Sequence, residues 1–288
     1  MNTSHTPTPR GETRTSALAG RWFPADADEL RRAVRRYLDE GKAAAQAALV
    51  LGRVAAVLAP HAGIVYSGPV AGAAWAAALE HTAAAYARVV LVGPAHRVAF
   101  KGIALGDYDA FAIPTGRVTV DRAALADLEA AGLGTFVPAA HVDEHCLEIE
   151  LPFLVEAFAG RVQPPIVPLL VGHVDEGEVA AALERVLRTD DLLVISSDLS
   201  HFHPYEDAAA RDEATLARVL ALDRRGLSGH AACGHEGLVA GLALARQRGW
   251  TSAFIGYQNS GDTAGDKDQV VGYGAVAFGP PLVPAGAL

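Results

Sequence analysis

The sequence of 288 residues contains only two cysteines, Cys146 and Cys233. Two thiols this far apart make no disulfide framework, which favours a reducing compartment, and we expect the cytoplasm. No apolar run approaches the ~20 residues that a transmembrane helix needs, and residues 1–16 lack the apolar core of a signal peptide. We therefore predict a cytoplasmic protein without a membrane segment, beginning with a disordered tail over residues 1–16.

Positive charge is also scarce, since the formal net charge is -9 and acidic and basic residues are mixed along the chain. A basic face that could neutralise phosphates is missing, which disfavours nucleic acid as a partner. The chain has no repeat of fixed period and no long Pro/Gly/Ser linker. With 51% hydrophobic residues it can form a sizeable core, and one domain over residues 17–288 is the simplest interpretation.

Alternating strand-like and helical segments dominate the sequence. Apolar runs separated by a helical pattern are typical of βαβ units and a parallel sheet. The chain then closes with two further strand-like runs. We predict an α/β fold with a mixed, mostly parallel central sheet flanked by helices. The expected strands are 54–63, 87–96, 164–173, 191–201, 251–260 and 270–279, and the expected helices are 23–48, 70–79, 176–187 and 207–222.

Polar side chains follow several of these buried runs. His61 and His96 end the first two, Asp198 and His201 follow a third, and His173 ends a fourth. Because ligand-binding groups collect at the carboxyl ends of strands in open α/β sheets, residues distant in sequence can meet there. Two imidazoles with a carboxylate or thiolate form an open site for a divalent transition metal.

The segment "DEHCLEIELPFL" predicts a helix capped by Asp143, with Leu147, Leu151, Leu154 and Phe158 as its apolar stripe. Glu144 and His145 then lie at its positive end, which would keep His145 neutral and able to accept a proton or bind a metal. Cys146 is expected in the core, and Glu148 and Glu150 on a solvated face or as capping partners.

The segment "HAACGHEG" places Cys233 in a glycine-flanked turn, close to His235 and Glu236. A thiolate near neutral pH requires a metal or positive neighbours, which the histidines above could supply. Trp22 is expected to pack in the core rather than to line a pocket. The remaining histidines are expected to be surface or structural residues: His5, His81, His141, His203 and His230.

Taken in order, "APHAGIVYSG", "LVGPAH", "DEHCLEIELPFL", "ISSDLSH" and "ACG" resemble the Memo family, the B protein of the AmmeMemoRadiSam system. That family is similar to class III extradiol dioxygenases. The resemblance implies that His61 and His96 bind a metal, with Cys233 beside them. It implies further that Asp198, His201 and His145 line the pocket as catalytic residues, His145 facing substrate or moving a proton. The third ligand stays open between Cys233 and either Asp198 or His201.

Two functions follow as hypotheses. The first is a non-haem iron(II) oxidase or dioxygenase acting on a small aromatic or polar molecule. The second is a non-catalytic copper- or iron-binding interaction protein, which a thiolate with two imidazoles would suit. Zinc-dependent hydrolysis is a third alternative, although the sequence has no HExxH motif. By family resemblance, AMMECR1-like and radical SAM proteins are expected as functional partners.

Overall fold

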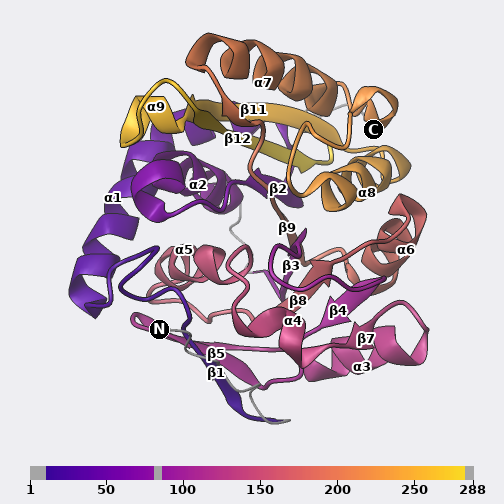
Figure 1. Ribbon diagram of the computed structural model, residues 1–288. Helices are drawn as coiled ribbons and strands as arrows, with labels where there is room; N and C mark the ends of the chain where they lie inside the picture. Colours follow the sequence, from indigo (N-terminus) through magenta and orange to yellow (C-terminus); the bar gives the residue numbers. More distant parts are fainter. Residues whose placement is uncertain (1–10, 81–85, 283–288) are drawn as a thin grey trace.

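The computed structural model describes residues 11–80 and 86–282 and shows a mixed sheet with a parallel centre (Figure 1). Strands β2 (Ala56–Ala59), β9 (Leu192–Ser196), β3 (Val89–Pro94) and β8 (Ile166–Val171) are neighbours in this order and run parallel. Every residue of these four strands is buried, which explains their continuous apolar sequences. The predicted α/β fold is therefore confirmed.

Antiparallel and short strands extend this centre on both sides. The long strand β12 (Val270–Gly279) pairs with β2, and β11 (Thr251–Asn259) and β10 (His201–His203) pair with β12. On the other side β4 (Ile103–Leu105) pairs with β8, and β7 (Thr135–Phe136) pairs with β4. A separate small sheet contains β1 (Thr13–Thr15), β5 (Ala110–Ile113) and β6 (Gly116–Thr119).

The small sheet includes the end of the segment that the sequence places in a tail. Thr13–Thr15 pair in parallel with β5, and Arg14 is buried. Residues 1–10 lie outside the described residues, as do His5 and His81. The part of the tail nearest the domain is thus built into the fold.

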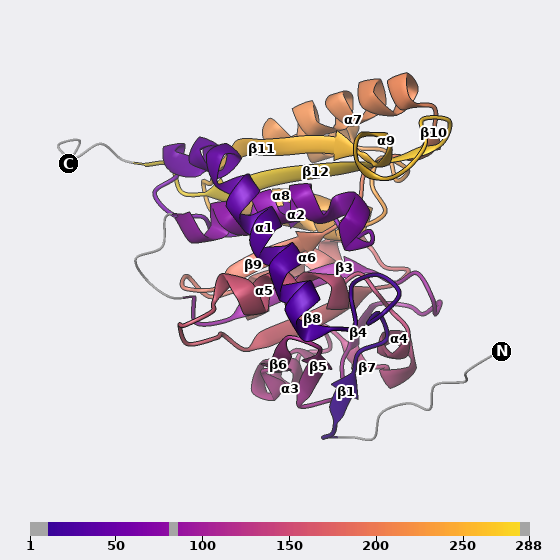
Figure 2. The same ribbon diagram turned by 90° about the vertical axis from the view of Figure 1, so that its left-hand side faces the viewer.

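Helices cover both faces of the central sheet (Figures 1 and 2). On one face α2 (Ile64–Glu80) packs against β2 and α5 (Leu151–Ala157), and α1 (Ala27–Ala45) lies outside both. On the other face α8 (His235–Gln247) contacts β3 and β9 and packs against α6 (Glu176–Val186). The remaining helices are α7 (Tyr205–Leu220) over β11 and β12, α3 (Arg122–Ala130) beside α6, and the short α4 (Pro138–Val142) and α9 (Ser260–Thr263).

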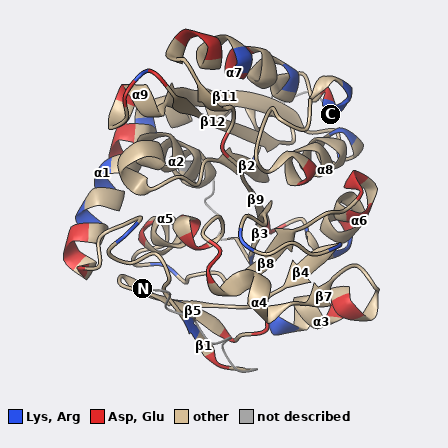
Figure 3. Cartoon of the chain, in the orientation of Figure 1, with Lys and Arg blue, Asp and Glu red and all other residues tan. Residues whose placement is uncertain are grey.

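Local sequence signals account for the outer helix. Asp26 accepts the main-chain N–H of Glu29 at 2.8 Å and begins α1. Leu30, Val34 and Leu38 form its buried face, as their spacing of four predicts. Charged residues lie mainly on the outward helices, whereas the central strands carry few (Figure 3). Within 11–80 and 86–282, no helix is both long and apolar enough to span a membrane.

The segment after α4 differs from its prediction. Asp143 ends α4 instead of starting a helix, residues Glu148–Glu150 form a 3-10 turn, and α5 begins only at Leu151. Pro152 has no N–H to donate and is tolerated only in the first turn, so the helix cannot begin much earlier. His145 therefore lies in a loop, and the expectation that a helix terminus keeps it neutral is wrong.

Candidate metal centre

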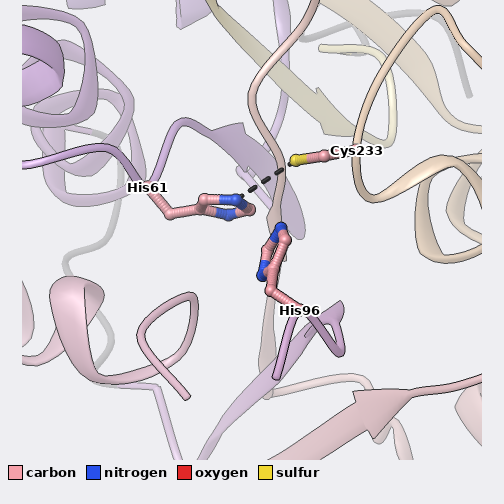
Figure 4. A group of neighbouring side chains, drawn as sticks. All are labelled: His61, His96 and Cys233. Carbon is pink, nitrogen blue, oxygen red and sulfur yellow. Dashed lines mark hydrogen bonds between the residues drawn. The ribbon is translucent and has the colours of Figure 1, made fainter. Parts of the chain in front are cut away.

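The two candidate histidines come together at the carboxyl edge of the parallel strands. His61 follows β2, His96 follows β3, and β9 lies between these strands and ends at Ser196. The rings of His61 and His96 have centroids 5.2 Å apart and are nearly perpendicular, at 79°. Both rings point toward Cys233, which approaches from the segment preceding α8 (Figure 4).

His61 is held in one tautomer by the end of β9. Its Nδ1 lies 2.9 Å from the Ser196 hydroxyl, and that hydroxyl donates its single proton to the Cys146 carbonyl at 2.6 Å. Ser196 must therefore accept from Nδ1–H, which leaves the Nε2 lone pair facing the Cys233 sulfur at 3.1 Å. Burial, reinforced by His145 and His96, lowers the pKa of His61 well below its ordinary value, so the ring is neutral.

A carboxylate fixes the orientation and tautomer of His96 in a similar way. Glu144 accepts the His96 main-chain N–H at 2.6 Å and the ring Nδ1–H at 2.9 Å. Burial opposes ionisation of Glu144, but the close approach of the His145 ring and the hydrogen bonds from His96 outweigh it and hold the pKa of this carboxyl well below its ordinary range. Among the described residues, no hydrogen bond engages the Nε2 atom of His96. Metal-binding histidines in proteins have their other ring nitrogen bonded in this way.

Cys233 is brought to the histidines by a close approach of α8 to β9. A Cβ at Gly234 would lie 2.8 Å from Ser197 Cβ and 2.9 Å from the Ser196 carbonyl oxygen, so only glycine fits there. The main-chain N–H of Cys233 donates to the Asp198 carbonyl at 3.1 Å. Burial, followed by the charge of Asp198, raises the pKa of Cys233 to about 12, so the thiol keeps its proton unless a cation displaces it.

The ligand atoms of His61, His96 and Cys233 all lie within 4.8 Å of one another, close enough to share one ion. The group His96, Glu144 and Cys146 meets the same distance limit. There, however, Glu144 is engaged by His96, and the Cys146 thiol donates to the Pro94 carbonyl at 3.1 Å. Cys146 is fully buried in the core, as predicted. Two imidazoles and a thiol fit a soft or borderline transition metal.

The other two candidates for a third ligand occupy different places. Asp198 lies behind the ligands, where its Oδ1 accepts the His61 main-chain N–H at 2.7 Å, and it is buried. Its carboxylate therefore fixes the turn that carries His61, and burial raises its pKa. His201 donates Nδ1–H to the Leu199 carbonyl at 2.8 Å and lines a cavity together with Cys233.

His145 packs beside the cluster, with its ring centroid 4.4 Å from that of His96 and 5.4 Å from that of His61. Trp22 covers its other side at 4.3 Å. His145 Nδ1 lies 3.0 Å from Glu144 Oε1, but this contact is misaligned for a hydrogen bond. Trp22 also lines a cavity of about 640 Å³ with Tyr66 and Tyr273. It is thus both a packing residue and a pocket wall.

Two carboxyl groups beneath the site were expected on a solvated face or as capping partners, and both are fully buried. Glu148 accepts from Arg14 at 2.5 Å and from Ser16 at 2.5 Å. Arg14 also donates to the carbonyls of His141, Val142 and Glu144, which fixes the loop carrying Glu144. Because its partner Arg14 is over 130 positions away, only the clustering of acidic and apolar residues in "EHCLEIEL" could have indicated this burial.

Glu150 is the second buried carboxyl. It accepts the Trp75 indole N–H at 2.7 Å, and its other oxygen lies 3.4 Å from the Ser196 hydroxyl. Burial raises the pKa of Glu150 to about 8, so it is protonated near neutral pH. A neutral carboxylic acid thus lies next to the serine that orients His61.

The remaining histidines lie outside the ligand group. His173 borders a separate cavity with Lys101 and Gly132. His141 is buried between the Tyr108 hydroxyl, at 2.8 Å, and the Ala104 carbonyl, at 3.0 Å, and is structural as expected. His203 and His230, expected to be surface or structural, line the same cavity as His201.

Fold and site together define an α/β protein with a candidate His–His–Cys metal-binding group at the carboxyl edge of a parallel sheet. The sequence profile of the Memo-like protein family matches residues 14–277, and the chain belongs to this family. A MEMO1 family protein of Aquifex aeolicus is 34% identical over 278 residues, covering 92% of this chain and 98% of that protein. A MEMO1 family protein of Ignicoccus hospitalis is 32% identical over 286 residues, with the same coverage.

Proposed function

We propose that this protein holds iron(II) between His61, His96 and Cys233 and uses O2 to oxidise a small aromatic or polar molecule. One observation carries the proposal. Each imidazole has its Nδ1 bonded to an acceptor, Ser196 Oγ or Glu144 Oε1, so that both rings are fixed with Nε2 available to one ion. The ligand atoms of the two rings and of the Cys233 thiol lie within 4.8 Å of one another.

The donor set and its surroundings suit this chemistry. Iron(II), when bound, would supply positions for O2 and a substrate oxygen and would pass electron density from the substrate to O2, which is the oxidant. Burial keeps the Cys233 thiol protonated in the absence of a metal, so the thiol would have to lose its proton to become a ligand. His201 has Nδ1 engaged by the Leu199 carbonyl, which leaves Nε2 to accept a proton from a substrate hydroxyl in the adjoining cavity. His145 would take the corresponding role on the Trp22 side, and Asp198 would hold the turn of His61.

Anaerobic loading with iron(II) followed by oxygen uptake over a panel of catechols tests the proposal. We expect one iron per chain and iron-dependent oxygen uptake, both abolished in His61→Ala and in His96→Ala. His173→Ala is the matched control, because this histidine lies at a different strand end in a separate cavity. Iron-loaded protein that consumes no oxygen with any substrate of the panel would count against the oxidase.

Cys233 favours a second candidate, a copper(I)-binding protein without turnover. Thiolate and imidazole ligands suit copper(I), which needs no open position for chemistry. Competition with a copper(I) chelator under anaerobic conditions separates the two functions. Tight copper binding lost in Cys233→Ser, together with absence of oxygen uptake by the iron form, would favour the copper protein.

Membership of the Memo-like family also supports a functional association with AMMECR1-like and radical SAM proteins. Co-expression followed by size-exclusion chromatography tests for a complex. Elution of each protein at its own volume would argue against a stable one.

A further inference from the structure

A cavity of about 660 Å³ borders Cys233 on the side of β10 and α7. This volume is ample for a small organic molecule. Cys233 belongs both to the cavity wall and to the ligand group. A molecule in the cavity would therefore reach the candidate metal centre directly.

The polar lining of this cavity is cationic or neutral. It includes His201, His203, His230 and Arg211, with hydroxyls from Thr215 and Ser228. None of the lining residues within the described ranges is acidic. This composition contrasts with the formal net charge of -9 for the whole chain. Hydrogen-bond donors and one guanidinium cation are therefore gathered at this cavity, without an acidic residue among its described lining.

Arg211 is the strongest donor of this set. Its side chain is exposed and has neither a carboxylate partner nor a hydrogen bond in the described part of the chain. By contrast, Arg218 on the same helix is paired with Asp223 at 2.9 Å. A guanidinium without a partner at a cavity wall is suited to bind a carboxylate or a phosphate through two parallel hydrogen bonds.

The histidines are directed by an irregular strand. In β10, His201 pairs with Val271 and His203 pairs with Val270. The two histidines are separated by one residue, whereas their partners in β12 are adjacent, so β10 contains a β-bulge. Phe202 between them has a φ of 59°, a left-handed conformation unusual for an aromatic residue, and its side chain is 68% exposed. Bulges of this kind redirect neighbouring side chains and are frequent beside functional sites. Here both flanking imidazoles line the cavity.

We propose that the cavity binds a small organic oxyanion, a carboxylate or a phosphate. The charged group of the bound molecule lies at Arg211 and the histidines, and the rest of the molecule extends to Cys233. That this molecule is the substrate rests on the proposed function, because a substrate requires a metal beside Cys233. Binding of the anion itself requires no metal. The two ideas can therefore fail separately.

Calorimetric titration of the metal-free protein, with the chelator removed and Tris as buffer, tests the inference. The probes are inorganic phosphate and benzoate, with neutral benzamide as the control ligand. We expect saturable binding of at least one anion, weakened by added NaCl and reduced about tenfold in Arg211→Gln, as loss of a charged hydrogen bond predicts. Arg161→Gln is the matched control, because Arg161 is likewise exposed and precedes β8, away from the cavity.

Preference for phosphate or for benzoate would identify which oxyanion the substrate carries. The inference is overturned if neither anion binds, if benzamide binds as well as benzoate, or if Arg211→Gln binds like the wild type. Anion binding without iron-dependent oxygen uptake would leave the cavity assigned and refute only the oxidase. Oxygen uptake without anion binding would support the oxidase and refute only the anion site.

Discussion

Replacing Glu150 by glutamine should make the protein more stable, and the gain should increase with pH. Glu150 is fully buried, accepts a hydrogen bond from Trp75 and has its pKa raised by burial to about 8. Glutamine keeps a carbonyl oxygen to accept from the Trp75 indole but cannot ionise. The substitution therefore removes a titrating group and preserves the hydrogen bond.

The magnitude follows from proton linkage. Between the ordinary pKa of 4.5 and about 8, the native carboxyl holds a proton that the unfolded chain has released. The free energy of unfolding contributed by Glu150 therefore falls by about 1.4 kcal/mol per pH unit as pH rises through this window. From about pH 5.5 to about pH 7.5, the advantage of Glu150→Gln over wild type should grow by about 2.7 kcal/mol.

Urea unfolding of the metal-free proteins across this pH range measures the difference directly. Glu178→Gln, which changes an exposed carboxylate on α6, should follow wild type throughout. If the stabilities of Glu150→Gln and wild type instead run parallel with pH, the Glu150 carboxyl is ionised in the folded protein. The account of a neutral acid beside Ser196 would then be wrong.

Three further substitutions probe the supports of the site. Glu144→Gln should weaken metal binding by about 10- to 100-fold in chelator competition, because His96 loses a charged partner; an unchanged affinity would contradict this role. Arg14→Met should cost about 3–5 kcal/mol in urea unfolding, since it leaves Glu148 buried without its cation, and Glu148→Gln added to it should recover part of the loss. Gly234→Ala should lower stability by about 1–3 kcal/mol through its contact with Ser197, and a wild-type melting temperature would refute that crowding.

Motifs in the sequence indicated the family and most of the elements. The buried runs became the parallel strands, and the spacing of Leu30, Val34 and Leu38 predicted the buried face of α1. His61 and His96 could be picked out because parallel strands present their carboxyl ends along one edge. Periodicity and strand-end position are local signals, and they can be read without knowing which segments touch.

Other features depended on partners far away in the chain. The segment around Glu148 and Glu150 resembles a solvated helix, yet Arg14 and Trp75 make both carboxyls part of the interior. Likewise, the cavity histidines His203 and His230 carried no motif, and only the bulge in β10 and the fold of the loop before α8 bring them together.

By itself, the sequence determined the α/β architecture, the family and the residue types available to a metal, because these follow from local hydrophobic patterning and ordered motifs. The tertiary structure alone decided which nitrogen of each imidazole faces the candidate metal position, which carboxyl is neutral and which guanidinium lies at the cavity wall. Tautomer, protonation and cavity charge depend on distances between groups from separate strands and loops. Those distances exist only after the chain has folded.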